Sequence, residues 1–177
     1  MHLEKQRPVA ISFSALSDST LSRHAIEETF TANALGIVVV TDLPAHYIPL
    51  RRKLLLLSLA FSELSDEIKE RYADAGSQYS YGWSLGKETM NGKLDHSKGS
   101  YYANPVQDER NKFPNDEPGC SQFQDTMQEM SRFVVEVGER IAGVCDEILD
   151  GVGGAVNGKG LEKLVKESRC SKARLLH

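Results

Sequence analysis

The sequence SQFQDTMQEMSRFVVEVGERIAGVCDEILD, residues 121–150, decides how this chain folds. Its apolar residues recur at alternating steps of four and three, which is the spacing of a helix that buries one side. This apolar stripe consists of Phe123, Met127, Met130, Val134, Val137, Ile141, Val144 and Ile148. The opposite side is polar and faces water. A stripe of this length must pack on another layer, and we expect that layer to be largely absent from this chain.

The composition excludes several classes of protein. The chain has 177 residues and a formal net charge of −4, without a basic stripe, which argues against nucleic acid as the main partner. No apolar segment is long enough to span a bilayer, so we expect no membrane association. The N-terminus lacks a signal-peptide core, and the three cysteines fit neither a disulfide framework nor a zinc site. We therefore expect a cytoplasmic protein with reduced thiols.

The first part of the chain predicts two strands separated by a helix. Residues 8–13 and 37–40 have the composition of strands, and the second run is apolar throughout, which indicates a strand covered on both faces. Between them, a helix from about residue 18 to about residue 34 is expected to bury Ile26 and Phe30.

The remaining segments complete an α+β fold that is mainly helical with a few short strands. Apolar residues over 54–72 predict two helices, because Ser65 supplies an N-cap between them. Residues 79–105 are rich in Gly, Ser, Tyr and Lys and indicate irregular strands and turns. A short helix over 161–168 and a strand over 173–177 follow the long helix.

The residues alone indicate no active site. Residues 153–160 nearly match a phosphate-binding loop, but Gly160 replaces the required Ser or Thr, so a flexible connection is the better interpretation. His24 and its neighbouring glutamates indicate a solvated helix face, and Asp95 and His96 are better interpreted as polar residues at the surface. Cys145 is expected to be a packed thiol. We predict no catalytic and no metal-binding residues.

Five segments, in this order, carry a resemblance to a known family: 36–44 (GIVVVTDLP), 61–71, 81–88 (YGWSLGKE), 99–105 (GSYYANP) and 174–177 (RLLH). They resemble the N-terminal region of the non-haem iron(II)/2-oxoglutarate-dependent dioxygenases, the group that includes isopenicillin N synthase. The resemblance covers nearly the whole chain. It implies that residues 1–177 form the N-terminal domain of a double-stranded β-helix (jelly-roll) oxygenase whose catalytic core is missing.

The family's metal ligands have no counterpart here. The family holds iron(II) with a His-x-Asp/Glu pair and a distant His, leaving positions open for 2-oxoglutarate and O₂. Only His2 gives a His-x-Glu sequence, and it lies ahead of the first predicted strand. We therefore expect no cofactor to be bound by this chain, whereas Fe(II) and 2-oxoglutarate are implied for a full-length family member.

The resemblance also implies which residues reach the substrate. In the family, strand positions on either side of the Gly in the 79–105 segment contact the substrate. Because side chains alternate along a strand, Ser80 and Ser84 face one way, and Tyr79, Tyr81 and Trp83 face the other. Aromatic residues in a row are more often core, so Ser80 and Ser84 are the substrate-side candidates. By resemblance, Tyr102 is the third.

Three hypotheses follow for the function. The first is the N-terminal part of an Fe(II)/2-oxoglutarate-dependent oxidoreductase, which shapes the entry of a small-molecule substrate, supports the catalytic core and is inactive alone. The second is a non-catalytic interaction module or truncated isoform, which binds a protein partner or itself through the exposed apolar face of helix 121–150. The third is an unrelated α/β domain that mimics the family by chance.

Overall fold

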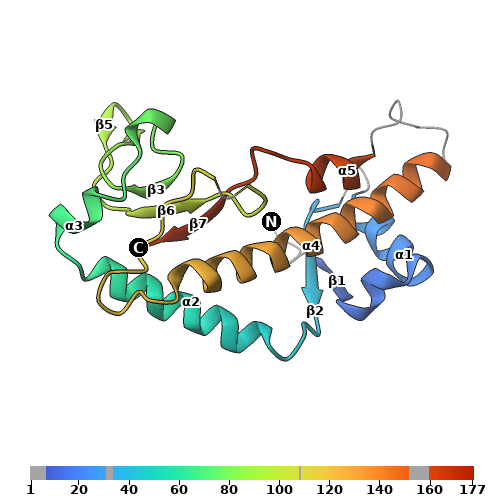
Figure 1. The fold of residues 1–177 in the computed structure, drawn as a ribbon. Helices are drawn as coiled ribbons and strands as arrows, with labels where there is room; N and C mark the ends of the chain where they lie inside the picture. Colours follow the sequence, from blue (N-terminus) through green and yellow to red (C-terminus); the bar gives the residue numbers. More distant parts are fainter. Residues whose placement is uncertain (1–6, 31–33, 108, 152–159) are drawn as a thin grey trace, which may run out of the picture. The chain divides into compact units, whose positions relative to one another are not determined.

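The structure is a computed structural model, and it describes residues 7–30, 34–107, 109–151 and 160–177 (Figure 1). The chain divides into two compact units. The first combines Met1–Ala45 with Val134–Glu167, and the second combines His46–Phe133 with Ser168–His177. Helix α4 (Phe123–Gly151) matches the predicted long helix, and part of it belongs to each unit. The mixture of helices and short strands agrees with the α+β prediction.

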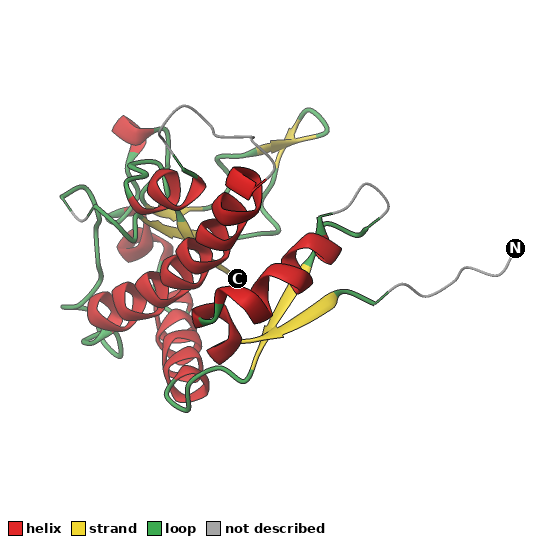
Figure 2. Ribbon diagram, turned by 90° about the vertical axis from the view of Figure 1, so that its right-hand side faces the viewer, coloured by secondary structure: helices red, strands yellow, loops and turns green. Residues whose placement is uncertain are grey.

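The first unit is built on a strand–helix–strand arrangement. Strand β1 (Val9–Ser12) pairs in parallel with β2 (Val38–Thr41). Two parallel strands cannot be joined by a tight turn, and here η1 (Ser14–Ser17) and α1 (Ser19–Thr29) form the connection. Figure 2 shows α1 running alongside this strand pair. The apolar side chains buried in this unit are Ile11, Leu16, Ile26, Ala142 and Val144.

Two sequence predictions in this unit are wrong. The sequence predicts that Phe30 is buried with Ile26, but Phe30 is 53% exposed because it lies just beyond the end of α1. The sequence also predicts that the run at 37–40 is covered on both faces, yet Ile37 and Val39 are exposed. Strand β2 belongs to a sheet of two strands, which leaves one of its faces uncovered by the described residues.

Asp146 joins the last helix of the first unit to α4. The main-chain N–H groups of Leu161 and Glu162 donate to the two carboxylate oxygens of Asp146, at 2.7 and 3.0 Å. A carboxylate at a helix N-terminus satisfies N–H groups that have no partner within the helix. Helix α5 (Leu161–Lys166) therefore begins against the side of α4.

Two helices begin the second unit, and they meet where the sequence predicts. Helix α2 (Tyr47–Ser62) ends before Ser65, and α3 (Asp66–Glu70) begins after it. The Ser65 hydroxyl accepts a hydrogen bond from the Ile68 N–H at 3.4 Å, which makes it the N-cap of α3. This confirms the predicted break.

The strands of the second unit form a three-stranded antiparallel sheet in the order β3-β6-β7 (Figure 1). They are β3 (Gly82–Ser84), β6 (Ser100–Ala103) and β7 (Ala173–Leu176). β6 is central and β7 lies at one edge. A short turn, η2 (Ala75–Ser77), precedes the sheet, and a small hairpin of β4 (Thr89–Met90) and β5 (Lys93–Leu94) lies between β3 and β6 in the sequence.

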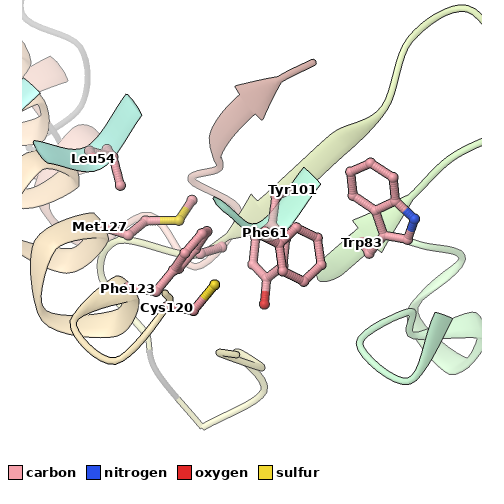
Figure 3. Close-up of a cluster of buried hydrophobic side chains, with 8 residues drawn as sticks. Leu54, Phe61, Trp83, Tyr101, Cys120, Phe123 and Met127 are labelled. Atoms are coloured by element: carbon pink, nitrogen blue, oxygen red, sulfur yellow. The ribbon is translucent and has the colours of Figure 1, made fainter. Parts of the chain in front are cut away.

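Phe61 lies at the centre of the core of the second unit (Figure 3). Its ring is fully buried and packs against the rings of Tyr101 and Trp83 from the sheet, at centroid distances of 5.0 and 5.5 Å. On the side of α4, Phe123 and Met127 close the same cluster. One face of the three-stranded sheet is therefore covered by α2 and the start of α4.

The apolar stripe of helix 121–150 is not exposed along its length, which corrects the expectation that its covering layer is largely absent. Phe123 and Met127 are buried in the core of the second unit, and Val144 is buried among residues of the first. Of the eight stripe residues, only Val134 is more than half exposed. The stripe is long because it serves two cores in succession.

Instead, α2 carries the exposed apolar row of the described structure. Ile48, Leu55, Leu56 and Leu59 are all strongly exposed, the least exposed being Leu55 at 46%. They recur at helical spacing and so share one face of α2. Among the described residues, no helix combines the length and apolar character that crossing a membrane requires.

Candidate functional site

The three-stranded sheet has an apolar face and a polar face, and the candidate site lies on the polar one. The register places Trp83, Tyr101 and Leu175 side by side, and these three pack into the core. Because successive side chains alternate, the neighbours of these residues point to the other face. Those neighbours are Ser84, Ser100, Tyr102, Arg174 and Leu176.

A pocket of about 160 Å³ opens beside this polar face. At about 30 Å³ for each liquid water, it holds about five water molecules, so it suits a small molecule or one end of a larger one. Its lining is Gln78, Tyr79, Ser80, Ser84, Lys87, Glu88, Tyr102 and Lys172. The three residues predicted to face the substrate, Ser80, Ser84 and Tyr102, all lie in this lining.

Glu88 is held at the pocket by three donors. The Tyr102 hydroxyl donates to its Oε1 at 2.8 Å, and Arg174 and Lys98 lie 3.1 and 3.3 Å from its carboxylate oxygens. The Tyr102 hydrogen bond, together with the two cations, holds the pKa of the Glu88 carboxyl below its usual value. Burial and the bond to Glu88 raise the pKa of Tyr102. At neutral pH the pair is therefore a carboxylate and a neutral phenol.

Arg174 of β7 lies beside the pocket, where it contacts the lining residue Tyr102. Its guanidinium donates to the Ser100 hydroxyl at 2.7 and 3.1 Å and lies 5.0 Å from the centre of the Tyr102 ring. Ser100 is itself buried. A planar guanidinium that binds two oxygens and stacks on a ring fixes the positions of all three.

Two lysines give the pocket positive charge. Lys172 donates to the Ser80 hydroxyl at 2.9 Å, and its Nζ lies 5.7 Å from the centre of the Tyr102 ring. The Nζ of Lys87 lies 5.2 Å from the centre of the Tyr79 ring and 3.3 Å from a carboxylate oxygen of Glu70, with which it forms an ion pair.

The assignment of Tyr79 to the core side is wrong, because Tyr79 lines the pocket. Strict alternation over 79–84 assumes one continuous strand, but β3 begins only at Gly82. Tyr79 and Gly82 have φ values of 58° and 66°, so the chain turns before the strand starts. Trp83, in contrast, lies in the core as predicted.

Sequence reasoning missed the charged residues of the site. Lys172 and Arg174 reach it only because β7 pairs with β6, a contact between segments far apart in the sequence. The signal that could have indicated Arg174 is the alternation over 173–176, which places it opposite to the apolar Leu175.

The other sequence-level candidates do not assemble a site. No group of three or more His, Cys, Asp or Glu suited to a metal ion occurs within residues 7–30, 34–107, 109–151 and 160–177. These residues therefore do not fit the His and carboxylate set that iron(II) needs. Glu27 pairs with Arg23 on an exposed helix face, and the Asp95 carboxylate accepts from the Ser97 N–H and hydroxyl.

Two further candidates have different outcomes. Burial raises the pKa of the Cys145 thiol, and the side chain is half-buried, as expected of a packed cysteine. The glycine-rich segment at 153–160 lies, except for Gly160, outside the described residues.

A solved structure from Caulobacter crescentus resembles this chain. That protein is provisionally assigned to the 2OG-Fe(II) oxygenase family, and the two structures superpose with a TM-score of 0.61 at 16% sequence identity. The two proteins share a fold. The match covers 94% of this chain and 54% of the other, so this chain spans about half the length of its structural neighbour. No protein-family model and no curated protein sequence matches the chain.

Proposed function

We propose that the chain is the N-terminal, substrate-side part of an Fe(II)/2-oxoglutarate-dependent oxidoreductase of the isopenicillin N synthase-like group. Two independent lines support this. The order of sequence segments resembles that family, and a solved structure with the same fold is provisionally assigned to the 2OG-Fe(II) oxygenases. In this role the chain shapes substrate entry and supports the catalytic core.

The observation that carries the proposal is the pocket on the polar face of the β3-β6-β7 sheet. The sequence and its family resemblance single out Ser80, Ser84 and Tyr102, and all three line this one pocket. Their hydroxyl groups offer donors and acceptors to a small polar substrate.

The iron and 2-oxoglutarate belong, in this proposal, to the jelly-roll core of a full-length family member. The described residues offer no iron ligand set, so no catalytic step is assigned to them. We expect the 177-residue chain to be inactive by itself.

The coding sequence that follows the His177 codon tests this proposal. A His-x-Asp or His-x-Glu sequence, a later His and a subsequent Arg would support it, because these residues bind iron and the co-substrate carboxylate in the family. Their absence in a complete transcript would refute it. A second test incubates the purified chain with Fe(II) and 2-oxoglutarate, and succinate formation there would contradict the expected inactivity.

A second candidate function is self-association through α2. Arg52 lies between Ile48 and the three leucines of its exposed apolar row, and Glu63 lies just beyond the end of the helix; both are exposed. When two copies of such a helix pack antiparallel, each Arg52 approaches the partner helix's Glu63, and the leucines face one another between them. The surface for this function is α2 and not the helix at 121–150.

Light scattering of the purified chain tests self-association. A discrete dimer that becomes monomeric in Leu56→Glu supports it. The matched control is Leu94→Glu in β5, which is almost equally exposed but lies outside the row. A monomer at all concentrations, or equal effects of the two variants, would exclude self-association through α2.

A further inference from the structure

Lys172 is the one cation of the pocket lining without a carboxylate partner among the described residues. Lys87 pairs with Glu70, whereas Lys172 donates to the neutral hydroxyl of Ser80. An ammonium group carries three N–H donors, and Ser80 takes one of them. The ammonium also lies 5.7 Å from the centre of the Tyr102 ring, which leaves it donor capacity for an acceptor at the pocket.

The acidic residue of the pocket does not compete for Lys172. Glu88 already accepts from Tyr102 and is paired with Arg174 and Lys98. Counted over the pocket and its paired neighbours, four cations face three carboxylates, although the whole chain is net negative. The cations are Lys87, Lys98, Lys172 and Arg174, and the carboxylates are Glu70, Glu88 and Asp95.

Two hydroxyl groups that can donate to a bound anion, those of Ser80 and Ser84, line the same pocket as Lys172, whereas the Tyr102 O–H already donates to Glu88. Ser84 is only 4% exposed. A cation beside neutral hydroxyl donors is suited to an anion, because each oxygen of the anion receives a charge-assisted or neutral hydrogen bond. The volume of about 160 Å³ limits that anion to a small group.

We propose that this pocket binds the carboxylate end of a small organic acid, with Lys172 as its charged anchor and the hydroxyls of Ser80 and Ser84 as hydrogen-bond donors, while the Tyr102 ring lines the same space. This inference rests on the proposed function and names the substrate class that the substrate-side pocket accepts. A carboxylate is favoured over a larger anion because the pocket is small, and because the rings of Tyr79 and Tyr102 in its lining can pack against an alkyl stem.

NMR titration of the 177-residue chain tests the proposal directly, without iron. The probes are butanoate and butanamide, which have the same shape but differ in charge. Butanoate is expected to shift the backbone amide signals of Ser80, Ser84 and Tyr102 with a millimolar Kd, as is usual for a small fragment. Butanamide is expected to leave them unchanged. Equal responses to the two probes would overturn the proposal.

Variants of Lys172 separate the charge from the fold. Lys172→Gln is expected to weaken butanoate binding about tenfold, because one charge-assisted hydrogen bond is lost. Lys172→Arg keeps the charge and is expected to retain most of the affinity. Lys93→Gln, an exposed lysine in β5, is the matched control and is expected to bind like the unmodified chain. Unchanged binding in Lys172→Gln would refute the role of this residue.

Two further comparisons separate the possible failures. Inorganic phosphate binding as tightly as butanoate would overturn the assignment to carboxylates in favour of anions in general. The oxygenase proposal is tested elsewhere, by the codons that follow His177. If the chain binds butanoate but those codons are absent, the oxygenase proposal fails and the carboxylate pocket stands. If the codons are present but butanoate does not bind, the carboxylate pocket fails and the oxygenase proposal stands.

Discussion

Replacing Phe61 with alanine should be the most damaging single change in the second unit. Phe61 has no exposed surface, and its ring touches four others. The centroid distances are 5.0 Å to Tyr101, 5.5 Å to Trp83, 5.8 Å to Tyr72 and 6.1 Å to Phe123. All four contacts are edge-on, which is a favourable arrangement of aromatic rings.

The expected loss follows from the size of the side chain and the rigidity of its surroundings. Phe→Ala in a packed core costs about 3–5 kcal/mol. Since the site is closed by rings from four separate segments and cannot easily collapse, the upper part of that range applies, about 4–5 kcal/mol. This is a large share of a typical unfolding free energy of about 5–15 kcal/mol. With an m-value of about 2 kcal/mol/M, the urea midpoint should fall by about 2 M.

Trp83 reports this loss without labelling, because it is the only tryptophan of the chain and belongs to the same cluster. Urea unfolding is followed through its fluorescence. Phe30→Ala is the control, because Phe30 is exposed and its removal should change stability by no more than about 0.5 kcal/mol. If Phe61→Ala lowers the midpoint by less than about 0.5 M at unchanged m, the cluster does not carry the stability assigned to it.

Three other predictions concern pH, backbone geometry and thiol reactivity. Burial lowers the pKa of His177 from 6.5, so the unfolded chain binds this proton more tightly than the folded chain does. The free energy of unfolding should therefore fall as the pH drops below 6.5. The urea midpoints at pH 7.5 and pH 5.5 should differ less in His177→Gln than in the unmodified chain. Gly82→Ala should destabilise the chain by more than about 1 kcal/mol in the same assay, because φ is 66° and the added Cβ collides with the Tyr72 carbonyl oxygen; an unchanged midpoint would contradict this. Iodoacetamide should modify exposed Cys170 well before buried Cys120, whose thiol pKa is raised by burial, and mass spectrometry after short labelling would reveal the opposite order.

Local signals in the sequence predict the elements well. The spacing of apolar residues indicates α4, and a single capping residue, Ser65, indicates the break between α2 and α3. Both signals act within one or two helical turns, so no knowledge of the tertiary structure is needed to interpret them.

Burial is predicted less well, because it depends on what packs on each element. Phe30 and Val39 have the residue types of a core, yet the described residues do not cover them. The long stripe of α4 leads to the opposite error. Its length suggests one missing layer, but Met127 is buried in the core of one unit and Val144 among the residues of the other.

The candidate site is predicted only in part. Ser80, Ser84 and Tyr102 follow from strand alternation and a family resemblance, and they line one pocket. Two of the charged residues at this pocket, Lys172 in its lining and Arg174 beside it, arrive through strand pairing over a long sequence separation. No periodicity within a single segment carries that information.

Strand β7 has a consequence for any chain that pairs with it. It lies at the end of the strand order in the described sheet, so its outer main-chain groups are a template for further extended backbone. An added strand would have to continue the alternation between the two faces of the sheet, with apolar side chains beside Leu175 and hydrophilic ones beside Arg174. Slipping by one residue would reverse that order and put charge against the aromatic cluster.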